Sequence, residues 1–215
     1  MQPINLNNRY RGRKIYNVFP ELRGIVMQLT TKLLSGIFLG LLFAGSALAA
    51  PDINAGKENA VMCFNCHGAE GNSTNSNFPT LAGQKPAYLA NQLRAFRDGT
   101  RDNGMMKNMT SSLSNEDINN LAAYFSSLKN KSAGGNEELA KQGKSKAPMC
   151  FGCHGNGAKG MGVTPRLAGQ HPAYLQRQLH AFKDGTRKNG PMRGIAGMLS
   201  DEGISAVTEY MGSLK

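Results

Sequence analysis

Two copies of the motif Cys-x-x-Cys-His constrain this chain more than any other feature. Residues 63–67 and 150–154 each carry the motif, and the chain contains no other cysteine. This motif is the signature of c-type haem attachment, in which two thiols add to the vinyl groups of a haem. The histidine that follows supplies one axial ligand to the iron. The chain is therefore predicted to bind two haem c groups covalently, through Cys63, Cys66, Cys150 and Cys153, with His67 and His154 as axial ligands.

The two motifs belong to an internal duplication of the chain. Sixteen of the 21 residues in segment 81–101 recur in segment 167–187 at an offset of 86, whereas the motifs are 87 residues apart. A repeat of this length indicates that each copy folds as one structural module. We predict one domain over residues 50–131 and a second over residues 132–215, with the polar, glycine-containing stretch 129–135 as the linker.

Residues 1–49 read as an export signal preceded by a polar extension. Lys32 precedes an apolar run that ends in Ala47-Leu48-Ala49, a small-x-small cleavage site. We predict cleavage before Ala50 and a periplasmic location, with Met27 as the hypothesised true start. An uncleaved membrane anchor is the alternative, because the uncharged stretch reaches 18 residues, the lower edge of a membrane span.

The charge balance limits the classes of partner. Residues 1–49 hold six of the 25 basic and one of the 14 acidic residues, so residues 50–215 carry a formal charge of +6. A mild positive charge favours acidic protein partners, and it leaves peripheral association with an anionic membrane open. Nucleic-acid binding is not expected, because no basic stripe with interleaved aromatic residues is present.

The hydrophobic pattern predicts an all-α fold with three main helices in each half. Apolar residues recur at helical spacing in segments 88–96 and 118–125, and no strand-like alternation is visible. Ser114 and Asp117 form a variant of the capping box, which Gly203 weakens in the second copy. A module of about 80 residues has a small core, so the haem is expected to complete it. The predicted helices begin near residues 54, 86 and 114, and near residues 136, 172 and 200. The first helix of each half is expected to run without a break into Cys63 or Cys150.

The sixth iron ligand is expected to be a methionine, because a thioether keeps the iron low-spin and raises its potential. The offset of 86 pairs Met106 with Met192, and no other methionine in this region faces a methionine in the other copy. Met62 also has a methionine partner, but it adjoins the first cysteine and cannot reach the opposite haem face. Met105 and Met109 are interpreted as packing residues.

The comparison of the two repeats assigns no definite function to several polar side chains. His171 and His180 pair with Lys85 and Arg94 in the other copy, so neither position requires an imidazole, and we predict both histidines to be exposed. A set of basic residues is compatible with docking an acidic partner, with holding haem propionates, or with a solvated helix face. This set is Arg94, Arg97, Arg101, Lys183, Arg187 and Lys188.

At these residues the chain resembles class I cytochromes c, and its doubling is similar to the dihaem cytochrome c4 family. The resemblance rests on the paired motifs, on segments 78–84 and 164–170, and on a methionine eight residues before the serine of the last helix. It implies two tandem cytochrome c domains packed head to head, with haem propionates near their interface. It also implies that the carbonyls of Pro79 and Pro165 accept hydrogen bonds from the axial histidines.

The resemblance further implies a single-electron carrier, not an enzyme, between a quinol-oxidising complex and a terminal oxidase. The first alternative is the dihaem electron-accepting subunit of a flavocytochrome sulfide dehydrogenase. A dihaem peroxidase would need an iron open to peroxide, whereas both halves offer a methionine. A zinc module of four cysteines is disfavoured, because zinc-binding pairs usually lie about 15–20 residues apart.

Overall fold

The computed structural model describes residues 50–215. These residues are helical with irregular connections, and within them no strand is present beyond an isolated bridge between Met161 and Thr164. No helix among residues 50–215 has the length and apolarity to cross a membrane. The predicted export signal lies outside the described residues.

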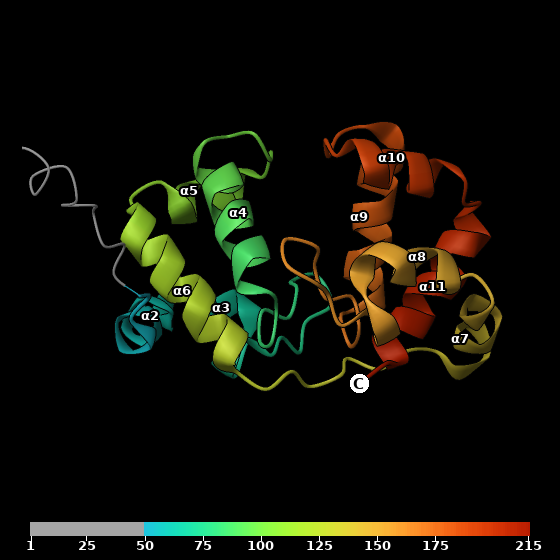
Figure 1. Ribbon diagram of the computed structural model, residues 1–215, viewed down its shortest axis with the longest axis horizontal. Helices are drawn as coiled ribbons and strands as arrows, with labels where there is room; N and C mark the ends of the chain where they lie inside the picture. The colour runs from blue at the N-terminus through green and yellow to red at the C-terminus, as the bar shows by residue number, and fades with distance from the viewer. Residues whose placement is uncertain (1–49) are drawn as a thin grey trace, which may run out of the picture. The chain divides into compact units, whose positions relative to one another are not determined.

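The elements from α2 to α6 are called the first half, and those from α7 to α11 the second half (Figure 1). The first half contains α2 (Ile53–Asn59), η1 (Val61–Cys63), α3 (Phe64–His67), η2 (Ala69–Gly71), α4 (Pro86–Arg97), α5 (Gly104–Thr110) and α6 (Asn115–Ser127). The second half contains α7 (Glu137–Lys144), α8 (Pro148–His154), η3 (Asn156–Ala158), α9 (Pro172–Asp184), α10 (Gly190–Gly197) and α11 (Asp201–Ser213).

The second and third predicted helices of each half are confirmed. Helices α4 and α9 begin at a proline, which lacks the N–H that a first helical residue would leave unpaired. Helix α6 begins with a full capping box between Ser114 and Asp117. In α11 the Ser200 side chain accepts from the N–H of Gly203, which has no side chain to complete the box.

The prediction that the first helix of each half runs unbroken into its motif is wrong. In the first half the chain tightens after α2 into the 3₁₀ turn η1, where the N–H of Cys63 donates to the carbonyl of Ala60 at 2.9 Å. In the second half Pro148 interrupts the pattern and begins α8, because proline cannot donate the hydrogen bond that would continue α7. Each motif therefore lies beyond the first helix of its half, the first motif in η1 and α3 and the second in α8.

Helices α5 and α10 were not predicted as separate elements. Each begins at an asparagine whose side chain accepts from a backbone N–H three residues on: Asn103 caps α5 and Asn189 caps α10. Asparagine is among the best N-cap residues, and the two asparagines occupy the same place in the repeat.

Helix α2 packs on α6, and helix α7 packs on α11 in the same way (Figure 1). Both contacts depend on a glycine that lets two backbones approach closely. A Cβ atom at Gly56 would clash with the carbonyl of Asn120, and one at Gly143 would clash with the carbonyl of Ala206. These two glycines hold the first helix of each half against the last.

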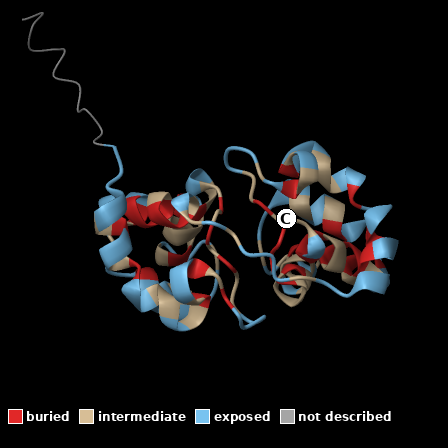
Figure 2. Cartoon of the chain, turned by 90° about the horizontal axis from the view of Figure 1, so that it is seen from below, coloured by how far each residue is buried: buried red, intermediate tan, exposed pale blue. Residues whose placement is uncertain are grey.

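Each half has its own hydrophobic core. In the first half Ile118, Leu121 and Phe125 lie on one face of α6 and pack against Leu89 of α4, as the helical spacing predicts. In the second half the core residues come from the corresponding elements. Figure 2 shows buried residues concentrated on the inward faces of the helices in both halves. The second core contains Leu175, Leu199, Ile204, Val207 and Met211.

Replacing Gly143 with alanine is expected to destabilise the fold by about 1–3 kcal/mol, because α7 must move away from α11 to admit the methyl group. Urea unfolding of the haem-loaded protein measures this loss. The control is Gly194→Ala in α10, where an added Cβ meets no atom within 4 Å. That change should be neutral or stabilising by about 0.5–1 kcal/mol. Equal losses in both variants would contradict the proposed packing role.

Candidate functional site

The two Cys-x-x-Cys-His motifs lie at the ends of short helices in corresponding places. In the first half the motif runs from the end of η1 through α3, and in the second half it forms most of α8. Both motif histidines are buried, with exposed fractions of 7% for His67 and 5% for His154. Both histidines are therefore withdrawn from bulk water.

Both histidines make the same hydrogen bond. The Nδ1 of His67 lies 2.8 Å from the carbonyl oxygen of Pro79, and the Nδ1 of His154 lies 2.8 Å from that of Pro165. A carbonyl oxygen only accepts, so Nδ1 carries the hydrogen and the lone pair is left on Nε2. A hydrogen bond from the ring N–H to a carbonyl fixes the orientation of a metal-binding imidazole and makes it more basic.

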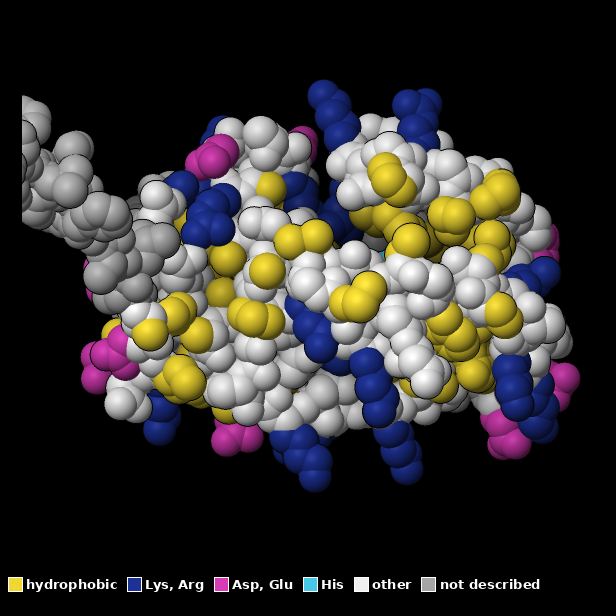
Figure 3. Space-filling view, viewed as in Figure 1, with side chains coloured by type: hydrophobic (Ala, Val, Ile, Leu, Met, Phe, Trp, Pro, Cys, Tyr) yellow, Lys and Arg dark blue, Asp and Glu magenta, His cyan; other side chains and the backbone are white. Residues whose placement is uncertain are grey.

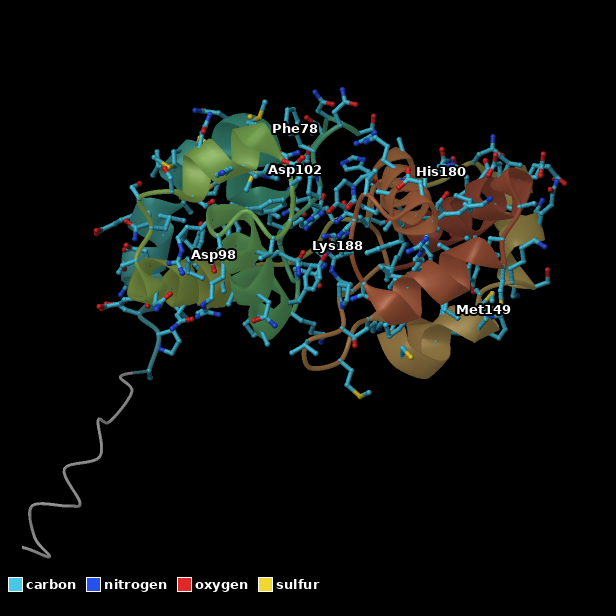
Figure 4. All side chains as sticks on the ribbon, turned by 90° about the horizontal axis from the view of Figure 1, so that it is seen from above. Phe78, Asp98, Asp102, Met149, His180 and Lys188 are labelled. Carbon is cyan, nitrogen blue, oxygen red and sulfur yellow. The ribbon has the colours of Figure 1, made fainter. Side chains whose placement is uncertain are left out.

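Burial also favours the neutral form of these rings. It lowers the pKa of His67 and of His154, and the hydrogen bonds to Pro79 and Pro165 oppose this only in part. A neutral imidazole is the form that binds a metal ion. Phe78, labelled in Figure 4, lies edge-on to His67 with 6.1 Å between the ring centroids.

No disulfide joins any of the four cysteines. Burial raises the pKa of Cys63, with the neighbouring Cys66 as a smaller cause, and burial likewise raises the pKa of Cys150. Among residues 50–215 no three His, Cys, Asp or Glu side chains gather into a metal-binding cluster. The two cysteine pairs are thus not brought together on one ion, as the zinc alternative would require.

Met106 and Met192 occupy the same position on two matching short helices. The N–H of Met106 donates to the Asn103 side chain at 2.9 Å, and the N–H of Met192 donates to that of Asn189 at 3.0 Å. Each methionine is therefore the third residue of a capped helix. The neighbouring Met105 is 57% exposed, whereas Met106 and Met192 are half-buried.

A cavity of about 1200 Å³ is lined by both motifs together with Met106 and Met192. Apolar side chains from α4 and α9, among them Leu89 and Phe182, form part of its wall. The thiols, the fixed imidazoles and the thioethers therefore border one largely apolar space. These are the donors that a covalently attached haem requires, and the lining suits its apolar macrocycle. Figure 3 shows hydrophobic side chains reaching the surface of both halves on one face.

Arg101 and Arg187, expected as partner-docking, propionate-holding or solvated residues, lie in a shared polar network. The guanidinium of Arg101 donates to Gln92 and Gln178 at 2.8 Å each. That of Arg187 donates to the same two glutamines at 2.9 and 2.6 Å. The bond from Arg101 to Gln178 and the bond from Arg187 to Gln92 join the two halves. The other contacts are Tyr174 and the Phe96 ring for Arg101, and Tyr88 and the Phe182 ring for Arg187.

Arg97 and Lys183, two other basic residues of this set, hold the start of the last helix. Arg97 donates to the carbonyl of Leu113 at 3.0 Å, and Lys183 donates to that of Leu199 at 2.9 Å. Both carbonyls belong to the residue before the N-cap serine. Lys188, labelled in Figure 4, is exposed.

The prediction that His171 is exposed is wrong. It is 8% exposed, and its Nε2 lies 2.9 Å from the carbonyl oxygen of Ser73 in the other half. The residue is the N-cap of α9 and lies where the two halves meet, so its burial comes from tertiary contacts that one repeat alone does not contain. His180 is exposed, as predicted.

The structure brings to the site several residues that had no predicted role. The glutamines at positions 84, 92, 170 and 178 make polar contacts between the halves, and the asparagines at 103 and 189 cap the helices that carry Met106 and Met192. The available signal was their identity in both copies of the repeat. Arg166 has no such signal, because Thr80 stands at its place in the first copy.

Arg166 is a buried guanidinium surrounded by carbonyl oxygens. It donates to Ala82 at 2.9 Å, to Gly83 at 3.2 Å, and to Ala168. Burial lowers its pKa to about 10, so the group remains charged at neutral pH. The carbonyl dipoles solvate this charge and join residues 82–83 to the second half.

Comparison with known proteins gives a consistent result. The Cytochrome c family model matches twice, over residues 53–129 and 140–215. Cytochrome c4 of Pseudomonas aeruginosa is 38% identical, covering 85% of this chain and 98% of the relative. A thiosulfate dehydrogenase electron acceptor of Thiomonas intermedia is 37% identical, covering 81% and 87% respectively. The crystal structure of reduced cytochrome c4 from Pseudomonas stutzeri superposes with a TM-score of 0.73 at 36% identity, covering 77% of this chain and all of that one.

The purified protein is expected to contain two haems that remain with the polypeptide in acidified acetone, because thioether bonds hold them. A pyridine haemochrome assay against protein concentration measures the ratio. Replacing Cys150 and Cys153 together with alanine should leave one attached haem, because the first half has its own cysteine pair. Haem that is fully extractable from the unmodified protein would contradict covalent attachment.

Proposed function

The chain belongs to the cytochrome c family, among its dihaem cytochromes c4, and on this premise we propose that it is a periplasmic single-electron carrier between a respiratory donor and a terminal oxidase. It carries two covalently bound haem c groups, one at each cysteine pair. Bound haem iron supplies reversible one-electron chemistry. The donor is proposed to be the quinol-oxidising complex, and the protein is proposed to transform no substrate of its own.

One observation carries this proposal. Each half offers a buried histidine with its Nε2 lone pair free, together with a methionine on a capped helix that borders the same cavity. We infer that His67 and Met106 hold the first iron, and that His154 and Met192 hold the second. With both axial positions filled by protein, no position is open to a substrate, and both oxidation states keep the same ligands.

The positive charge of the chain supports a protein partner with a negatively charged surface. Residues 50–215 carry a formal charge of +6, and Lys and Arg side chains project from both halves in Figure 3. A positive carrier is attracted to an acidic docking site, which speeds encounter at low ionic strength. A peripheral association with an anionic membrane surface has the same electrostatic basis.

A second candidate is electron acceptance from a sulfur-oxidising enzyme. The flavocytochrome sulfide dehydrogenase alternative belongs to this class of electron donor. One relative points to thiosulfate dehydrogenase as another donor of the same class. The Thiomonas intermedia protein, a thiosulfate dehydrogenase electron acceptor, is 37% identical over most of both chains. Thiosulfate dehydrogenase is therefore the alternative donor to test.

Replacing Met106 with alanine is expected to open the sixth position of one iron, lower the potential of that haem and admit carbon monoxide on reduction. The second haem should keep its methionine-to-iron absorption band. Met105→Ala and Met109→Ala are the matched controls, because both residues are exposed and should leave two methionine-ligated irons. If Met109→Ala opens an iron and Met106→Ala does not, the assignments of Met106 and Met192 are both wrong.

The haem-loaded protein is expected to be reduced rapidly by quinol and the quinol-oxidising complex, and then oxidised by a terminal oxidase. Stopped-flow absorbance measures both rates, and the rate of reduction should fall as ionic strength rises because salt screens the attraction. Reduction by thiosulfate dehydrogenase with thiosulfate, but not by the quinol-oxidising complex, would replace the proposed donor with the second candidate.

A further inference from the structure

Gln84 and Gln170 are buried amide side chains at the same place in the repeat, with exposed fractions of 4% and 3%. Each ends a Leu-Ala-Gly-Gln segment just before the proline-led helix of its own half. A buried amide must find partners for both its donor and its acceptor. Both glutamines find these partners in the opposite half.

Gln84 binds both backbone groups of Arg166. Its Oε1 accepts from the N–H of Arg166 at 2.7 Å, and its Nε2 donates to the carbonyl of Arg166 at 2.9 Å. Gln170 binds Thr80 in the same way, at 2.8 and 2.9 Å. The two pairs of bonds are therefore reciprocal: the glutamine of each half holds one residue of the other.

The residue held in each case follows the proline that binds the axial histidine. The N–H of Arg166 and the carbonyl of Pro165 belong to one planar peptide group, and that carbonyl accepts from His154 at 2.8 Å. An acceptor on the N–H polarises the peptide and strengthens the bond at its carbonyl. The Gln84 oxygen, the 165–166 peptide and His154 thus form one chain of hydrogen bonds. Gln170, the 79–80 peptide and His67 form the other.

We propose that the axial histidine of each haem is oriented and tuned by the glutamine of the opposite half. Gln84 is a positioning residue for His154, and Gln170 is one for His67. The proposal rests on the axial assignment made above. A stronger bond at Nδ1 makes the imidazole a better donor and favours ferric iron, so loss of the glutamine should raise the potential of the haem in the other half.

If each glutamine acted only within its own half, the opposite result would be expected. The Oε1 of Gln84 also accepts from the N–H of Lys85 at 2.9 Å, and that of Gln170 from the N–H of His171 at 3.0 Å. These bonds support the start of α4 and of α9 within the same half. If they were the main role, a substitution would disturb the histidine of its own half.

The test uses the reduced, haem-loaded full chain labelled with ¹⁵N-histidine, which has only four histidines to assign. Gln84→Met should shift the Nδ1 signal of His154, speed exchange of its hydrogen about fivefold and raise the potential of the second haem. His67 should be unchanged. Gln170→Met should give the reverse pattern. The proposal is overturned if a glutamine substitution changes the histidine of its own half, changes both histidines equally, or changes neither.

The matched control is Gln92→Met. Gln92 joins the halves through its bond from Arg187 and also accepts from Arg101 of its own half. Its hydrogen bonds do not involve the proline peptides. It should leave both Nδ1 exchange rates unchanged. If it reproduces the effect of Gln84→Met, the cause is general loosening between the halves, and the proposal is wrong.

A second variant keeps the test decisive if the methionine variant does not fold. Gln84→Glu retains an acceptor for the N–H of Arg166 and adds a negative charge. The reduction potential of the second haem should therefore fall, and a rise overturns the proposal. Failure of the axial assignment is separately visible. In that case the unmodified protein would show the nitrogen shifts of free imidazoles at His67 or His154.

Discussion

The hydrogen bond between each motif histidine and a proline carbonyl is the interaction on which the site depends. At 2.8 Å it selects the tautomer of His67 and of His154, and it leaves Nε2 of each ring free for iron. The backbone of residues 78–84 and 164–170 must lie where it does for these bonds to form. The contacts between the halves fall on these same segments, so ligand geometry and the packing of the halves are linked.

A small core explains why the haem is structural as well as functional. The buried apolar residues of each half are few for a module of about 80 residues, and those of the first half come mainly from α4 and α6. The cavity of about 1200 Å³ lies where further core would otherwise be. Covalent attachment keeps an apolar body in this space, and its burial adds hydrophobic stabilisation that the side chains alone do not supply.

Duplication repeats the geometry of the site but not its charge. The histidine, methionine and glutamine contacts recur in both halves with nearly the same distances. Arg166 breaks this equivalence, because a charged guanidinium is buried beside the peptide that holds His154, whereas Thr80 is neutral. The two sites are thus alike in the geometry of their proposed ligands and unlike in electrostatics.

The sequence by itself determined the attachment motifs, the duplication and the helices that begin at Pro86, Pro172, Ser114 and Ser200, because these depend on covalent chemistry and local backbone preferences. The comparison of repeats also selected Met106 and Met192, an assignment that stays a prediction. Only the tertiary structure decided the burial of His171 and the crossed contacts of Gln84 and Gln170. The physical reason is that a polar side chain becomes buried through whatever packs on it, and here that neighbour is about 80 to 100 residues away in the chain.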